Sequence, residues 1–356
     1  MFGRLKHIIT FMVLWFALAS CDKTIHEYPG THDLKVIVEC SVDTSEPTYF
    51  TNVECDPETG TSYVVRAQQA GTKGTRFDEP VCLRYIVDLY RETASSAVFV
   101  ERKIAFSEVD APNPQVAVEF TNVKAEKYKI LVWCDYVQDD VRESWYYITD
   151  DLTKILYADV EVVDNNDKDV FTNMMNIDLT EYYYSEGDYE FRYSLNLERP
   201  KGKFRCISTD ISDYLKEGKD VENITAVVSY VQYVSAGYNV LEQKPNYFEP
   251  TRTFITKART TQHQGNDAIE LCYDYVFVNG KQTNVKINFG FYEGDIEIVN
   301  GEVVGNKISQ WMGIVVPLKR NKETIVEGRM LTTSFGTGGF GIDPSFENEI
   351  VIPWGD

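Results

Sequence analysis

The thiol of Cys21 is the side chain whose surroundings most clearly predict a chemical reaction. Residues 18–21 read Leu-Ala-Ser-Cys, the order of a bacterial lipobox, in which an aliphatic residue and two small residues precede the cysteine. The small residues let the chain enter a narrow protease cleft, and the thiol would accept a diacylglycerol. Cleavage would then make Cys21 the first residue of the mature protein. The alternative is an ordinary signal peptide with a chance cysteine.

The residues before this cysteine have the features of a secretory signal. Arg4 and Lys6 give a positive start, and an apolar stretch follows at 8–19. That stretch is shorter than the about 20 apolar residues of a membrane helix, and no other run approaches this length. Two or three acyl chains would anchor the protein stably, because each buried methylene contributes about 0.8 kcal/mol. The sequence therefore predicts a signal peptide over 1–20, a tether over 21–32 and a lipid-anchored envelope protein.

Other residue types that commonly carry catalysis do not form a recognisable motif. None of the four histidines lies in a Ser–His, Cys–His or His-Glu-x-x-His context. They are His7, which would leave with the signal peptide, His26 and His32 in the tether, and His263 in a polar segment. We therefore expect no enzyme and no cofactor.

One acidic segment has part of a calcium-binding pattern. Asn165, Asp167 and Asp169 have the 1-3-5 spacing of a calcium loop. The sixth position holds Val170 instead of glycine, however, and the twelfth holds Asn176 instead of glutamate. A plain turn between strands is the preferred interpretation, and no metal site is predicted.

The charge and the cysteines limit the partners and the location. With 35 basic and 55 acidic residues the net charge is −20, which becomes −22 when the two basic residues of the signal peptide are removed. Such a surface repels nucleic acid and anionic lipid. An even number of further cysteines permits disulfides in an exported protein, but most lie in strand-like runs and are expected to be buried apolar side chains. These cysteines are Cys40, Cys55, Cys82, Cys134, Cys206 and Cys272.

Short runs in which apolar and polar residues alternate recur along the whole chain and predict β-strands. They lie at 33–42, 81–92, 97–106, 115–123, 127–137, 154–163, 189–198, 203–211, 224–234, 268–278, 283–293, 309–319, 323–333 and 348–354. The same alternation places most aromatic residues of 143–151 and 181–193 in the core.

The segments between these runs carry turn signals. Asn279-Gly280 and Asn300-Gly301 are predicted as type I′ hairpin turns. One short helix is expected at 208–219, and 57–80 is interpreted as a long mobile loop. The resulting prediction is an all-β protein made of two tandem antiparallel β-sandwiches, at 33–187 and 188–356.

The segment 118–137 resembles paired strands of the transthyretin-like sandwiches in Bacteroidetes fimbrial proteins. In those proteins a strand ending in an aromatic residue is followed by a turn and by an aromatic-aliphatic strand that ends in tryptophan and an acidic residue. Here Phe120 and Tyr128 flank the turn, and Trp133 and Asp135 close the second strand.

The segment 316–333 resembles the late hairpin of fimbrillin-type pilins and their accessory subunits. On this comparison Asn321 turns the chain, and Thr324 and Val326 lie in the returning strand. Gly328 is then expected at a bulge or a close approach of two backbones.

The resemblance implies two transthyretin-like domains in a lipoprotein precursor that reaches the outer membrane and supports adhesion as part of a fimbria. It also implies that a trypsin-like protease cuts after an arginine and releases the first strand. A strand of another fimbrial subunit, of the same or a different kind, then fills the groove. Backbone hydrogen bonds and alternating side-chain pockets give such strand addition its affinity.

The match to this scheme within the sequence is partial. The matched residues are Leu34, Val36 and Val38 in the first strand, Ile350 and Ile352 in a donor strand, and the cleavage arginines Arg66 and Arg76. Two solvated loop cations are the plainer interpretation of the arginines. Members that polymerise carry the cut site before most of the domain, whereas Arg66 lies 45 residues beyond the lipid cysteine.

Two alternatives stay open at this stage. One is an uncleaved accessory subunit that keeps its lipid and anchors or regulates the fibre. The other is a monomeric surface lipoprotein that binds a host or dietary glycan, or a host protein.

Overall fold

A computed structural model describes residues 34–56, 62–65, 80–109, 114–158, 165–299 and 302–333 of the chain. This part is almost entirely β, with 21 strands, which confirms the predicted all-β class. Its helices are α2 (Ile211–Lys216) and the 3-10 helices η1 (Asn166–Lys168), η2 (Thr180–Tyr182) and η3 (Val221–Asn223). Among the described residues, no helix has the length and apolar character needed to cross a membrane.

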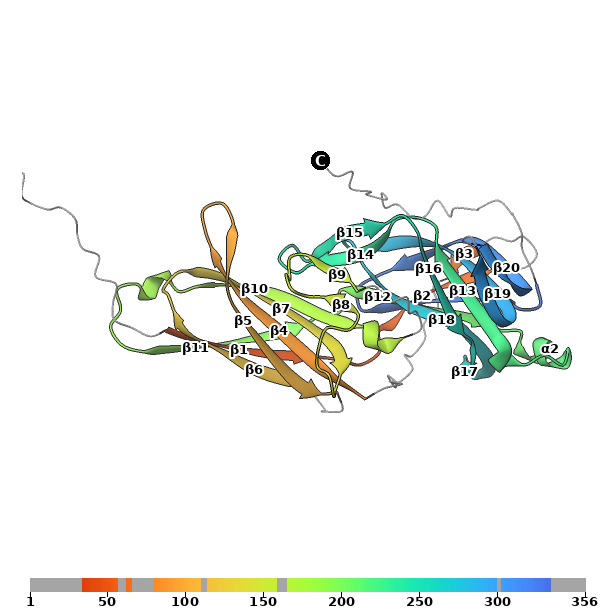
Figure 1. Ribbon diagram of the computed structural model, residues 1–356, viewed down its shortest axis with the longest axis horizontal. Coiled ribbons are helices and arrows are strands. Elements are labelled where there is room, and N and C mark those ends of the chain that lie inside the picture. Colours follow the sequence, from red (N-terminus) through yellow and green to blue (C-terminus); the bar gives the residue numbers. More distant parts are fainter. Residues whose placement is uncertain are drawn as a thin grey trace, which may run out of the picture.

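One sandwich forms in the half of the molecule that contains the N-terminal strand (Figure 1). Its three-stranded sheet has the order β11 (Tyr189–Leu197), β1 (Leu34–Val42), β6 (Gln115–Val123). Its four-stranded sheet has the order β10 (Val170–Asp178), β7 (Lys127–Gln138), β4 (Val81–Glu92), β5 (Ala97–Glu108). Apolar side chains from both sheets meet in one buried cluster, which we call the N-terminal core and which includes Val36, Tyr85, Phe120 and Val132.

A second sandwich fills the other half. Its six-stranded sheet runs β17 (Arg259–His263), β18 (Asn266–Phe277), β12 (Lys201–Ser208), β21 (Lys322–Gly328), β2 (Thr48–Cys55), β3 (Ser62–Val65). The facing sheet runs β16 (Arg252–Lys257), β13 (Ile224–Tyr230), β19 (Thr283–Val299), β20 (Glu302–Leu318). The buried cluster between them, the C-terminal core, includes Phe204, Ile287, Phe289 and Trp311.

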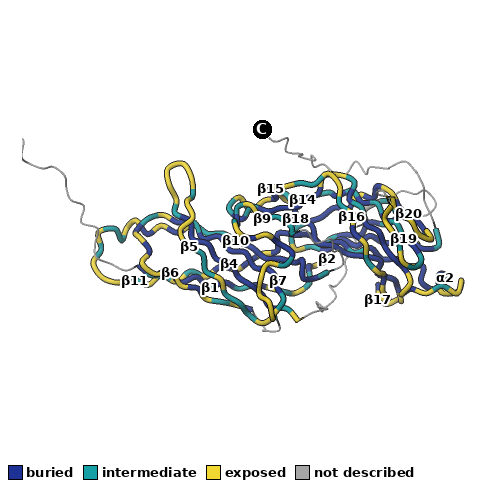
Figure 2. The backbone as a smooth tube through the Cα atoms, viewed as in Figure 1, coloured by how far each residue is buried: buried dark blue, intermediate teal, exposed yellow. Residues whose placement is uncertain are grey.

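A small sheet and an aromatic cluster lie where the two halves meet. The sheet runs β15 (Lys244–Glu249), β14 (Val234–Asn239), β9 (Ile155–Tyr157), β8 (Tyr147–Ile148). The cluster, which we call the junction cluster, contains Trp133, Tyr147, Tyr238 and Phe277. Strand β7 therefore has buried residues on both faces, because one face adjoins the N-terminal core and the other this cluster. Figure 2 shows buried backbone through the middle of the molecule and an exposed hairpin between β4 and β5.

Most strand pairs are antiparallel, as expected, but three are parallel. These are β1 with β11, β12 with β21, and β2 with β21. Two of these pairs, β1 with β11 and β2 with β21, join strands from opposite sides of the predicted boundary at 187–188. The position of that boundary stays a prediction.

Two predictions about turns were wrong. The segment 57–80 is not a single loop, because β3 lies within it and pairs with β2. Asn279-Gly280 does not form a type I′ hairpin. Only Gly280 has a positive φ, 68°, and the chain passes there from β18 to β19, which belong to different sheets. The second predicted hairpin does form, since Val299 pairs with Glu302 across it.

The late segment 316–333 also differs from its predicted form. Asn321 turns the chain with φ 53°, and Thr324 and Val326 lie in the returning strand, as expected. The flanking strands β20 and β21 belong to facing sheets, however, so the segment is a corner between sheets and not a hairpin. At Gly328 a Cβ atom would lie 2.8 Å from the Cys55 carbonyl oxygen, which confirms the close backbone approach.

Candidate functional site

Strand β1 occupies the middle of its sheet. It pairs in parallel with β11 on one side and antiparallel with β6 on the other. Leu34, Val36 and Val38 are fully buried, with 0% of each side chain exposed. Because alternate residues of a strand point to the same face, these three side chains enter the N-terminal core together. The predicted first strand therefore supplies both the central hydrogen-bonding ladder and a row of apolar anchors.

The outer face of β1 is polar and complementary to both neighbours. Lys35 Nζ lies 2.8 Å from a carboxylate oxygen of Glu119 on β6 and 3.4 Å from one of Glu190 on β11. Glu39 accepts a hydrogen bond from Arg192 of β11 at 3.1 Å. Exposed ion pairs of this kind contribute little stability. They do favour one register, since a shift of one residue would move the charged side chains into the core.

The chain that follows β1 continues into the other half of the molecule. Strand β2 lies between β21 and β3, and its Val53 and Cys55 belong to the C-terminal core. Both β2 and β3 precede Arg66. A cut at Arg66 or Arg76 would therefore separate three strands from the rest of the chain, and not only the first strand as predicted.

The other predicted site residues cannot be located. Cys21, Arg66, Arg76, Ile350 and Ile352 all lie outside the described residues. Their proposed roles in lipid attachment, cleavage and strand donation stay predictions.

An exposed apolar edge on β5 was not predicted. Strand β5 is the last strand of its sheet, and Val98, Phe99, Val100 and Ile104 are between 43% and 51% exposed. Proteins usually protect edge strands, because unpaired backbone groups beside apolar side chains invite another strand. The run Val98-Phe99-Val100 is apolar at three consecutive positions. This pattern indicates that apolar side chains lie on both faces of the strand here, because successive residues point to opposite faces.

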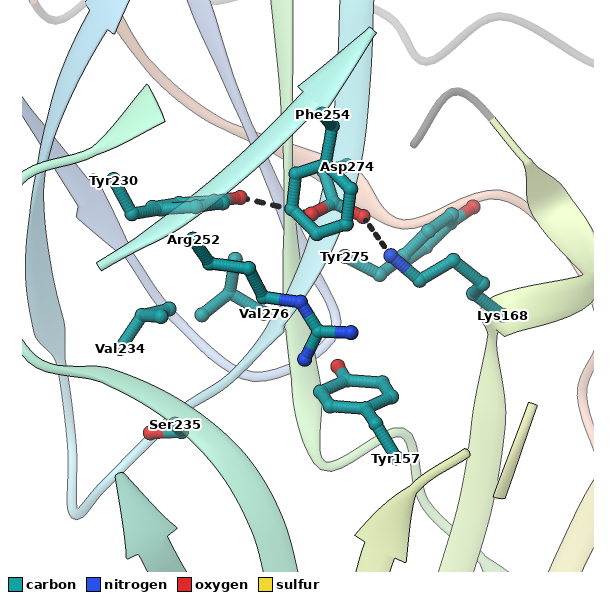
Figure 3. A pocket seen from close by; sticks show the side chains of 10 residues that line it. All are labelled: Tyr157, Lys168, Tyr230, Val234, Ser235, Arg252, Phe254, Asp274, Tyr275 and Val276. Carbon is teal, nitrogen blue, oxygen red and sulfur yellow. Dashed lines mark hydrogen bonds and ion pairs between the residues drawn. The ribbon is translucent and has the colours of Figure 1, made fainter. Parts of the chain in front are cut away.

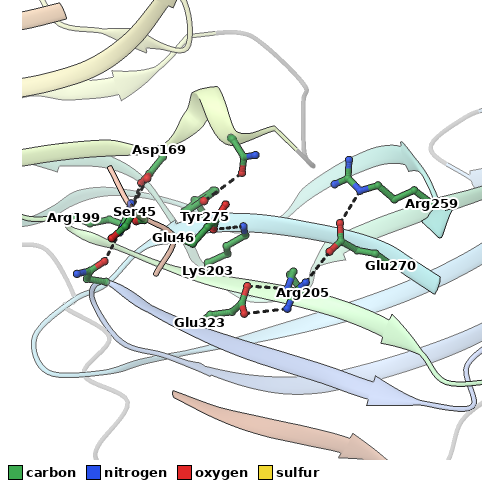
Figure 4. A network of polar contacts seen from close by, with 12 residues as sticks. Ser45, Glu46, Asp169, Arg199, Lys203, Arg205, Arg259, Glu270, Tyr275 and Glu323 are labelled. Carbon is green, nitrogen blue, oxygen red and sulfur yellow. Dashed lines mark hydrogen bonds and ion pairs between the residues drawn. The ribbon is translucent and has the colours of Figure 1, made fainter. Parts of the chain in front are cut away.

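The segment with the calcium-like spacing is part of a buried ion-pair network (Figure 4). Asn165 caps η1 by accepting a hydrogen bond from the backbone N–H of Asp167. Asp169 lies 2.7 Å from Nε of Arg199, and both side chains are buried. Burial raises the pKa of the Asp169 carboxyl, and the positive charge of Arg199 opposes this effect. The segment forms the short 3-10 helix η1 directly before β10, and the expected absence of a metal site stays a prediction.

Lys201 is a buried amine close to this network. Its Nζ donates to the backbone oxygen of Lys168 at 2.9 Å and lies 4.5 Å from the centroid of the Phe277 ring. Burial lowers the pKa of Lys201 well below 10.5.

We expect Lys201 to make folding stability depend on pH. Between its folded pKa and 10.5 the unfolded chain binds more protons than the folded chain, so stability rises with pH. One such proton contributes up to about 1.4 kcal/mol per pH unit. Lys201→Met should flatten the rise in urea-unfolding free energy in the pH range below 10.5, whereas Lys281→Met, at an exposed position, should not. Equal slopes in the two variants would contradict this assignment.

All six cysteines that follow Cys21 in the sequence are described, and all are buried thiols in the structure. Cys40 and Cys134 lie in the N-terminal core, and Cys206 and Cys272 in the C-terminal core. Burial raises the pKa of Cys40 to about 12. Their role as small core side chains agrees with the sequence-based expectation.

Several solved structures from Bacteroidetes are similar in layout. The fimbrial anchor protein Mfa2 from Porphyromonas gingivalis is 9% identical with a TM-score of 0.39, over 79% of this chain and 83% of that chain. A protein from Bacteroides eggerthii, provisionally described as a cell adhesion protein, is 14% identical with a TM-score of 0.39, over 89% and 92%. A protein from Bacteroides thetaiotaomicron, provisionally described as polysaccharide-binding, is 7% identical with a TM-score of 0.40, over 78% and 80%.

These TM-scores are too low to establish a shared fold or function. No curated protein matches the chain. Residues 44–354 match the model of a family described as a family of unknown function, DUF6562. Since that match covers most of the sequence, the chain belongs to the DUF6562 family.

Proposed function

We propose that this protein is a lipid-anchored structural or accessory subunit of a surface fimbria, without catalytic activity, that assembles with other subunits by β-strand addition. The observation that carries the proposal is the position of β1. It is the middle strand of its sheet, and it precedes the arginine-containing segment 66–79 in the chain. A cut in that segment would free β1 from all covalent connection to its two neighbours.

The groove that β1 leaves would be specific for another strand. Strands β11 and β6 would each lose their hydrogen-bonding partner, and the N-terminal core would lose the side chains of Leu34, Val36 and Val38. An incoming strand must therefore supply backbone donors and acceptors and apolar side chains at every second position. The segment 348–354 has this alternation at Ile350, Ile352 and Trp354, so it is the proposed donor.

The proposed location follows from the N-terminal sequence. Acylation of Cys21 would hold the precursor in the outer membrane, with the sandwiches on the outside of the membrane or in the fimbria. The strongly acidic mature chain, with net charge −22 after loss of the two basic signal-peptide residues, does not favour binding to nucleic acid or anionic lipid. A ligand on a host surface is a proposed partner for adhesion.

The proposal is tested by limited digestion of the folded mature chain with an arginine-specific protease. We expect one early cut, at Arg66 or Arg76, followed by oligomers that resist dissociation in cold detergent. The double variant Arg66→Ala/Arg76→Ala should stay uncut and monomeric. The double variant Ile350→Asp/Ile352→Asp should be cut but should not assemble, because each substitution would place a charge in an apolar pocket.

A different outcome would favour one of the alternatives. A cut chain that stays monomeric would contradict strand addition through β1. A chain that is neither cut nor assembled would favour the uncleaved accessory subunit or the monomeric glycan- or protein-binding lipoprotein. Screening on a glycan array would then separate these two.

A further inference from the structure

A lysine and an aspartate from distant parts of the chain meet in the interior. Nζ of Lys168, at the end of η1, lies 2.9 Å from Oδ1 of Asp274 on β18 (Figure 3). The two side chains are only 2% and 4% exposed. They are 106 residues apart in the sequence and connect the segment before β10 to the six-stranded sheet of the other half.

The surroundings of this pair are aromatic. The centroids of the Phe254 and Tyr157 rings lie 4.7 Å and 5.5 Å from Lys168 Nζ. On the other side of the carboxyl group, the hydroxyl of Tyr230 donates a hydrogen bond to Asp274 Oδ2 at 2.9 Å. The contact is therefore shielded from bulk water, and each oxygen of Asp274 has a separate partner.

Further charged groups lie beside this pair, and one of them, Arg252, is itself 3.5 Å from a carboxylate oxygen of Glu249. Lys201 donates to the backbone oxygen of Lys168, and the Arg252 guanidinium lies over the Phe254 ring at 5.2 Å. Burial lowers the pKa of the Lys168 amine, although Asp274 opposes the effect. Deprotonation of this amine therefore costs less free energy than it does in water, which favours the neutral, nucleophilic form.

We propose that Lys168 and Asp274 are the sites of a spontaneous intramolecular amide bond. Within the ion pair, one proton first moves from the Lys168 ammonium to the Asp274 carboxylate. The lone pair of the resulting Nζ amine then attacks Cγ, one N–H proton and the carboxyl hydroxyl leave as water, and an N–C bond replaces the C–O bond. One amine and one carboxylic acid give one amide and one water. The step needs no oxidant, reductant or cofactor.

The geometry supplies what this condensation requires. The fixed 2.9 Å contact holds the nucleophile beside the carboxyl group, which replaces a bimolecular encounter by an oriented one. The hydrogen bond from Tyr230 is directed at Oδ2 and stabilises the negative charge that develops there in the tetrahedral intermediate. The product is favoured because a neutral amide replaces a buried ion pair whose desolvation is costly.

The amide would be a covalent bridge between the two halves. It would bypass the 105 residues between positions 168 and 274. Tension applied along the chain would then pass through the amide bond and would not pull the two halves apart at the junction cluster. This inference does not depend on cleavage or strand addition, and its test uses the monomeric mature chain.

The mass of the intact, denatured protein tests the proposal directly. We expect the folded wild-type chain, after purification, to weigh one water molecule less than its sequence, and a tryptic digest to contain one peptide that joins positions 168 and 274. Lys168→Met should restore the full mass. Asp274→Asn should lose ammonia in place of water, because the NH2 group of the side-chain amide then leaves as NH3.

A matched control distinguishes this pair from an ordinary buried ion pair. Lys203 also lies 2.8 Å from a carboxylate, that of Glu46, and close to aromatic rings, but this pair is more exposed, at 6% and 15%. Lys203→Met should therefore keep the loss of one water. The full sequence mass for the folded wild-type chain, without any joined peptide, would overturn the proposal.

Discussion

Replacing Trp133 with alanine is expected to lower the free energy of unfolding by about 3–5 kcal/mol. Trp133 is fully buried in the junction cluster, with 0% of its surface exposed. Its ring centroid lies 5.3 Å from that of Tyr147 and 6.3 Å from those of Tyr238 and Phe277. These neighbours come from β8, β14 and β18, so the substitution would open a cavity between the two halves and not within one sandwich.

Urea unfolding followed by circular dichroism measures this effect. Because the junction cluster couples the halves, we expect the Trp133→Ala transition to broaden or to separate into two steps. Trp145→Ala is the matched control, since Trp145 packs on Tyr146 at 4.4 Å but is only partly buried. A loss for Trp133→Ala no larger than that for Trp145→Ala would contradict the role of the cluster.

The alternating pattern predicted the strand that contains Trp133 but not its second buried face. Period two in "KYKILVWCDYV" indicates a strand, and β7 spans Lys127–Gln138. The partners of the second face, Tyr238 and Phe277, come more than 100 residues later in the sequence. No local pattern indicates such a contact. The prediction that most aromatics of 143–151 and 181–193 are buried holds for Tyr146 and Tyr147, because the same junction covers them. It is wrong for 181–193, where Tyr184 is 69% exposed and the other aromatic rings are only partly buried.

The N-terminal strands show a similar limit. Strand β1 was predicted over 33–42, within one residue of its observed bounds, since its apolar residues alternate regularly. Strand β2 was missed, because "TYFTNVEC" mixes polar and apolar residues and its neighbour β21 is almost 300 residues away. The parallel pairing of β2 with β21 joins segments that are far apart in the sequence, so no local pattern indicates it. It changes the candidate site, since release of the N-terminal segment would disturb both sandwiches.

Arg199 holds this N-terminal segment in place, and Arg199→Ala is expected to cost about 3–5 kcal/mol of unfolding free energy. Arg199 is buried and lies 2.7 Å from Asp169, while its Nη2 donates to the backbone oxygen of Ser45 at 3.0 Å. Its Nη1 donates to the side chain of Asn321. One guanidinium therefore joins the start of β10, the link between β1 and β2, and the corner before β21.

Loss of Arg199 would leave the Asp169 carboxyl buried without its cation, which is the main reason for the large effect. It would also remove the contact to Ser45. Under the proposed function, replacement of β1 by a strand of another subunit should therefore become faster, in addition to the loss of stability. Arg192→Ala is the matched control. The Arg192 side chain forms ion pairs but is 59% exposed, so this substitution should change stability by no more than about 1 kcal/mol.

Urea unfolding gives the stability of each variant. If the proposed strand addition takes place, the rate at which arginine-protease-treated chains form detergent-resistant oligomers gives the rate of exchange. If Arg199 clamps the strand linker, Arg199→Ala assembles faster than a variant of equal instability elsewhere, such as Trp311→Ala in the C-terminal core. Equal assembly rates in these two variants would show that Arg199 contributes to stability alone, and that the contact to Ser45 does not control release of β1.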